Sequence, residues 1–174
     1  MSKLLESLAQ KADCIELDNT SQTSVLKIRH ALSIINIIMT DSQIVNAVMH
    51  AFTSKQAYVS ILPLSQKVKL SLPEVEKLLD MGKAEHQAFE YLTNECNTQS
   101  NLKTKLNILK LEVQITGEIT PVGNYHEILD EVHADLEFLF MRKYRNVAFR
   151  AGYKKLLLKA AIASAIYGEP TEGK

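Results

Sequence analysis

The sequence predicts a mainly α-helical domain with a small antiparallel β element, a winged-helix-like middle and a C-terminal helical hairpin. The chain has 174 residues with no Trp, 6 Gly and 4 Pro, a composition that disfavours a turn-rich all-β fold. Apolar residues recur at helical spacing towards both ends of the chain. In the middle, short stretches alternate apolar and polar residues, which is the period of a β-strand.

Length and composition fit one domain with a single core. Hydrophobic residues make up 46% of the chain and charged residues 23%, which are ordinary globular values. A chain of this length can bury a core without metals or disulfides. We divide it into N-terminal helices over 1–56, a helix-turn-helix-like segment with short strands over 57–122, C-terminal helices over 123–168 and a mobile tail over 169–174.

The N-terminal part predicts three helices. The first is amphipathic, with Leu4 and Leu8 on one side. The second, over 25–39, is apolar around nearly its whole circumference towards its end, so we expect it to be central and buried. The third follows the polar "TDSQ" and places Ile44 and Val48 on one face.

Three stretches in the middle of the chain predict short strands. "AYVSIL" over 57–62 is rich in β-branched and aromatic residues, and "KVKLSL" over 67–72 alternates apolar with polar residues. The clearest alternation lies over 108–116, where one face would carry Leu109, Leu111, Val113 and Ile115. A small sheet is therefore expected.

Between these strands, "LSLPEVEKLLDMGKAEHQAFEYL" over 70–92 predicts two short helices joined by a tight turn. Pro73 suits a first helical turn, and "DMG" suits the connection. The pair can be a DNA-reading helix-turn-helix or a hairpin packed on the core. A recognition helix should present basic groups, whereas this one presents Glu85 and Glu90 against Lys83. We expect a helix-turn-helix in shape rather than in function.

Charge is balanced overall, with 20 basic and 20 acidic side chains, but it is locally polarised. A basic segment follows the acid-rich stretch 127–137 and contains no acid before Glu169. It is either a solvated helix surface that complements neighbouring acids, or an anion-binding surface for nucleic acid or for an acidic partner. Its cations are Arg142, Lys143, Arg145, Arg150, Lys154, Lys155 and Lys159.

The last predicted helix, "YKKLLLKAAIASAIYG", is apolar on nearly all sides. Such a helix is buried in its own domain or against another chain. Its small residues would allow close helix packing, so we expect self-association or docking of a helical protein partner there. The predicted interface residues are Leu157, Ala161, Ile162, Ala165 and Ile166.

No catalytic, cofactor-binding or metal site is predicted. The sequence contains no Gly-rich phosphate loop, no GxSxG and no HExxH, and no small-molecule substrate is evident. Asp130 and His133 are spaced like half of a metal site, but the second half is missing. Cys14 and Cys96 are lone cysteines, which favours a reducing, cytoplasmic location. The longest apolar run is too short to span a membrane.

These observations predict a non-enzymatic interaction or assembly module that binds a helical protein partner or forms a homo-oligomer. The alternative is a winged-helix-like nucleic-acid-binding protein. In that alternative Lys83, His86 and Gln87 would enter the groove, while Lys67, Lys69, Lys103 and Lys105 would contact phosphates.

Overall fold

The computed structural model describes residues 19–37, 39, 43–44, 46–48, 68, 70–117, 119–120 and 123–168. Within these ranges the chain is mainly helical, which confirms the predicted class, and it contains no β-strand. The helices are α2 (Asn19–Ile34), α4 (Leu72–Leu79), α5 (Lys83–Thr98), α6 (Ser100–Thr116), α7 (Asn124–Lys143) and α8 (Tyr153–Tyr167).

Helix α2 contains much of the second predicted helix and packs against α4. It buries Ile28 and Leu32, as the apolar pattern predicts. The helix ends at Ile34 rather than at Met39, because the chain turns at Asn36, whose φ is +62°. The predicted first helix, the predicted strand over 57–62 and the tail over 169–174 lie outside the described residues.

Both helices predicted from the stretch 70–92 are present. Ser71 and Glu74 form a capping box at the start of α4. The Ser71 Oγ accepts the Glu74 backbone N–H at 3.5 Å, the Ser71 backbone N–H donates to the Glu74 carboxylate at 2.9 Å, and Pro73 occupies the first turn. Helix α5 begins after the short connection Asp80–Gly82. Leu72, which was expected at the end of a strand over 67–72, instead begins α4.

The predicted strand over 108–116 is wrong, because these residues form the second half of α6. Alternating apolar residues fit a strand, but they also fit a helix that is apolar on two opposite faces. Leu102 and Leu106 continue the helical spacing upstream and are buried together with Leu109, whereas Leu111 and Ile115 are exposed. The small β element is therefore not part of the described fold.

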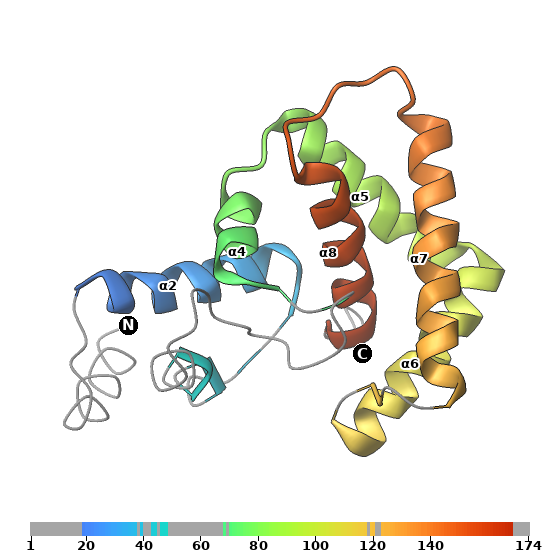
Figure 1. The fold of residues 1–174 in the computed structure, drawn as a ribbon, viewed down its shortest axis with the longest axis horizontal. Helices are drawn as coiled ribbons and strands as arrows, with labels where there is room; N and C mark the ends of the chain where they lie inside the picture. The colour runs from blue at the N-terminus through green and yellow to red at the C-terminus, as the bar shows by residue number, and fades with distance from the viewer. Residues whose placement is uncertain are drawn as a thin grey trace.

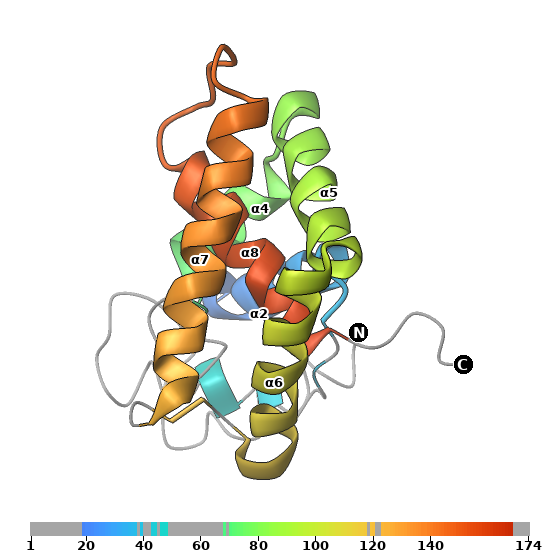
Figure 2. The same ribbon diagram turned by 90° about the vertical axis from the view of Figure 1, so that its right-hand side faces the viewer.

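Helix α8 is the centre of the helical assembly. It contacts α5, α6 and α7, and Figure 2 shows it between α7 on one side and α5 with α6 on the other. Leu156, Leu157, Leu158 and the four residues over 160–163 have almost no exposed surface. The all-round apolar character of this helix is therefore satisfied inside the chain.

Two glycines bound α8. Gly152, with φ of +85°, precedes it and separates it from α7, so the two helices form the expected C-terminal hairpin with a loop over 144–152 (Figure 1). At the other end, Gly168 pairs with Ile37 in an isolated antiparallel bridge. A Cβ atom on Gly168 would collide with the Ser164 carbonyl oxygen and lie 3.0 Å from the Asn36 carbonyl oxygen, so this position requires glycine.

Candidate functional site

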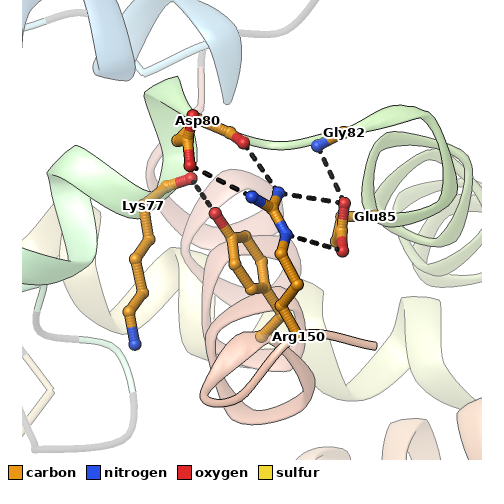
Figure 3. A network of polar contacts seen from close by, with 6 residues as sticks. Lys77, Asp80, Gly82, Glu85 and Arg150 are labelled. Atoms are coloured by element: carbon orange, nitrogen blue, oxygen red, sulfur yellow. Dashed lines mark hydrogen bonds and ion pairs between the residues drawn. The ribbon is translucent and has the colours of Figure 1, made fainter. Parts of the chain in front are cut away.

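Arg150 links the loop between α7 and α8 to the connection between α4 and α5 by hydrogen bonds. Its guanidinium donates to both carboxylate oxygens of Glu85 at 3.2 and 3.3 Å. It also donates to the Asp80 carboxylate at 3.1 Å and to the Asp80 carbonyl oxygen at 2.7 Å (Figure 3). The turn that would approach DNA in a helix-turn-helix is thus held by another part of the same chain.

Glu85 was expected on the outward face of α5, and this expectation is wrong. The residue is only 6% exposed, because its carboxylate turns back to accept the Gly82 N–H at 2.8 Å and the guanidinium of Arg150. The hydrogen bond from Arg150 lowers the pKa of Glu85, although burial acts in the opposite direction. Glu85 is therefore part of the contact between α5 and the loop before α8.

Tyr153 completes the same contact network at the start of α8. Its hydroxyl donates to the Lys77 carbonyl oxygen at 2.9 Å, and its ring lies 4.5 Å beneath the Arg150 guanidinium. Burial raises the pKa of Tyr153. This network therefore links α4, α5 and α8.

Two further cations of the basic segment are also paired internally. Lys154 contacts Glu137 at 3.1 Å, and Lys159 contacts Glu74 at 2.7 Å. The hydrogen bond from Lys154 lowers the pKa of Glu137. Together with Arg150, these side chains fit the interpretation in which the basic segment complements neighbouring acids.

The other cations of the segment, Arg142, Lys143, Arg145 and Lys155, are exposed. They form no ion pair within the described part of the chain. Arg142 lies 5.5 Å from the ring centroid of Phe138, and Lys143 lies 5.0 Å from that of Tyr91. Both are cation–π contacts, which orient the cations and leave their charge uncompensated.

Three large exposed apolar side chains lie within a few residues of three of these cations along the chain. Phe138 is 63% exposed, Met141 46% and Val147 42%. Phe138, Met141 and Arg142 share one face of the last turns of α7. We name this region, at the top of Figure 1, the α7 end surface: Phe138, Met141, Arg142, Lys143, Arg145 and Val147.

An aromatic cluster supports the α7 end surface from below. Phe140, Tyr144 and Phe149 contact one another with ring centroids 5.2 to 5.7 Å apart, and Tyr144 also meets Tyr91 edge-on at 5.8 Å. The aromatic residues among the cations therefore pack with one another. They hold the end of α7 and the following loop in a fixed arrangement.

Those residues of the nucleic-acid alternative that the structure describes do not gather on one surface. Lys83 and Gln87 are exposed near the start of α5, but His86 contacts Glu90 at 3.1 Å. Lys103 lies in α6, beyond the full length of α5, which is about 24 Å at 1.5 Å per residue.

Lys105 is already held by two carboxylates in α7. Its ammonium group contacts Glu131 at 3.2 Å and Asp135 at 3.1 Å. Lys67 and Lys69 lie outside the described residues. The placed lysines thus lack the shared surface that the alternative requires.

The residues predicted as an oligomer interface are mostly inside the chain. Leu157, Ala161, Ile162 and Ile166 are buried, and Ala165 is half-buried. In this conformation they offer almost no surface to a partner. Sequence reasoning missed Phe138 and the other exposed apolar side chains, because they lie beside positions that belong to the core.

No metal-binding or membrane-spanning feature is found among the described residues. They contain no group of three or more His, Cys, Asp or Glu side chains that could hold a metal ion. None of the described helices is both long enough and apolar enough to cross a bilayer. Cys96 is a buried free thiol, and burial raises its pKa to about 12.

Comparison with known proteins identifies no relative, so a function has to be inferred from the fold and these contacts. The chain matches no protein-family model, and no curated protein and no solved structure is significantly similar to it.

Proposed function

We propose that the protein is a non-enzymatic interaction module that binds an acidic, partly apolar protein partner through the α7 end surface. One observation carries the proposal: residues 138–147 contain three large exposed apolar side chains and three cations that have no acidic partner in the described part of the chain, and Arg142 lies over the exposed Phe138 ring. Large exposed apolar groups mark interaction surfaces, and uncompensated charge selects the sign of the partner.

In the proposed mechanism the apolar and the basic side chains have different roles. Burial of Phe138, Met141 and Val147 would supply affinity. Arg142 would receive a carboxylate of the partner, because its planar guanidinium can donate two parallel hydrogen bonds. The aromatic cluster beneath the surface reduces the entropy that binding must overcome, since these groups are already fixed.

An amphipathic acidic helix or peptide is the partner that fits this chemistry. Nucleic acid fits it less well, because its backbone offers phosphates but no aliphatic groups to cover Met141 and Val147. We place this interaction in the cytoplasm, where a free thiol such as Cys96 persists.

Fluorescence anisotropy with three labelled probes tests the proposal. The first is a peptide helix with Glu on one face and Leu on the other; the second is poly-glutamate; the third is duplex DNA. We expect the amphipathic peptide to bind more tightly than poly-glutamate, and Met141→Asp and Arg142→Glu to weaken its binding. Lys155→Glu is the matched control, because Lys155 is exposed on α8 outside this surface.

Two results would contradict this function. Equal binding of poly-glutamate and the amphipathic peptide would remove the role of the apolar side chains. Tight, strongly salt-dependent binding of duplex DNA without binding of the peptide would favour the nucleic-acid alternative.

A further inference from the structure

Helix α6 carries a row of exposed apolar side chains, which we name the α6 row. Its members are Ile108, 40% exposed, Leu111, 55%, and Ile115, 73%. Their spacing of three and four residues aligns them along one side of the helix. The opposite side carries Leu102 and Leu109, which are buried in the core. Helix α6 is therefore apolar on two opposite faces.

A helix at the edge of a domain needs only one apolar face. Charged and polar groups normally occupy the other face, because exposure of aliphatic side chains to water is energetically unfavourable. Three large side chains in one exposed row indicate that this face is covered in the functional state. This second face is also what made the sequence over 108–116 alternate like a strand.

Opposite charges flank the α6 row. On the side away from α7 lie Lys103, which is exposed, and Lys110, which is half-buried. On the other side, across the contact between α6 and α7, lie the exposed Glu127 and Glu131. The ion pair between Lys105 and Glu131 fixes which side of α6 faces α7.

The ion pair between Lys105 and Glu131 also shows which residues of α6 and α7 lie at the same height along the two helix axes. Helices α6 and α7 run antiparallel (Figure 1). Lys110 is five residues beyond Lys105, and Glu127 is four residues before Glu131. Lys110 and Glu127 therefore lie at nearly the same level on opposite sides of the α6 row.

This arrangement suits a second copy of the chain. When two copies meet through the α6 row with a twofold axis along α6, the basic side of each faces the acidic side of the other. An axis perpendicular to α6 would instead place like charges together. The formal net charge of zero adds no long-range repulsion between copies.

We propose that the α6 row is a self-association surface, on which a second copy packs with its own α6 in parallel. The central contact is Leu111 against its symmetry mate, with Lys110 facing Glu127 of the other copy. This interface is distinct from the α7 end surface, so either can exist without the other.

Light scattering over a range of protein concentrations tests the self-association. The mass of the natural chain should rise towards twice its monomer value of 19.5 kDa. Leu111→Glu should raise the Kd of the dimer about tenfold or more, as expected for a residue at the centre of an interface. Val147→Glu is the matched control, because Val147 is an exposed aliphatic residue outside α6, and its mass curve should not change. A monomeric mass at every concentration would overturn the proposal.

Charge reversal tests the parallel arrangement. Lys110→Glu and Glu127→Lys should each raise the Kd about threefold, a size consistent with the two weak exposed ion pairs that twofold symmetry creates, and the double variant should restore it. Failure of the double variant to recover would overturn the parallel packing, and recovery would exclude an unrelated partner as the occupant. Leu111→Glu should still bind the amphipathic acidic peptide, whereas Val147→Glu should lose that binding and keep the dimer. The experiments can therefore contradict the peptide-binding proposal and the self-association proposal independently of each other.

Discussion

Helices α6 and α8 show that apolar content alone does not locate an interface. Helix α8 is apolar on nearly all sides, and from its sequence it was the predicted interface, yet its own neighbours bury it. Helix α6 has the more ordinary composition, yet it leaves the α6 row exposed. What matters is the apolar surface that remains after the chain has packed on itself.

The sharpest test of this comparison makes the same substitution in both helices. Leu157→Ala in α8 should lower the free energy of unfolding by about 3 kcal/mol, because it leaves a cavity in a fully buried site. Leu111→Ala in α6 should change it by less than about 0.5 kcal/mol in the monomer. Urea unfolding at low protein concentration measures both. Equal losses would mean that α8 is no more central than α6.

The pH dependence of stability tests the link between Glu85 and Arg150, which holds α5 against the loop before α8. Glu85→Gln should lower the free energy of unfolding at neutral pH by about 1 kcal/mol, because the first turn of α5 loses its negative charge. Arg150 holds the pKa of Glu85 below its usual value of 4.5. The stabilisation is therefore present above that pH and is lost as the pH falls through the lowered pKa of the folded state.

Denaturant unfolding of both proteins between neutral and acidic pH measures this difference. The two stability curves should converge in acid, where Glu85 is protonated in the natural chain. Glu137, whose pKa is also lowered, is present in both proteins, so its contribution cancels. A difference that stays constant in acid would show that the carboxylate charge of Glu85 is not what matters.

The sequence predicted the helices where apolar spacing and capping residues agree. The hairpin of α7 and α8 and the start of α4 at Pro73 are of this kind. It failed at α6, where two apolar faces imitate the period of a strand.

It failed again at Glu85, because the partner of that carboxylate, Arg150, is 65 residues away along the chain. Local sequence shows a charge but not the group that folding brings to it. For the basic segment the sequence left two interpretations open, because it does not show which cations lie beside acids after folding.

The smallest expected effect separates the two halves of the basic segment. Lys159→Ala should lower the free energy of unfolding by about 1 kcal/mol, because its ammonium lies 2.7 Å from Glu74 and both side chains are largely buried. Arg145→Ala should leave stability unchanged within about 0.5 kcal/mol, since Arg145 is exposed and unpaired in the described part of the chain.

Thermal unfolding of both variants, with peptide binding on the same samples, provides the comparison. Lys159→Ala should keep its affinity for the acidic peptide, whereas Arg145→Ala should bind it more weakly. If Arg145→Ala instead loses stability, then Arg145 serves the fold as Arg150 and Lys159 do, and the α7 end surface would lose one of its three cations as a binding group.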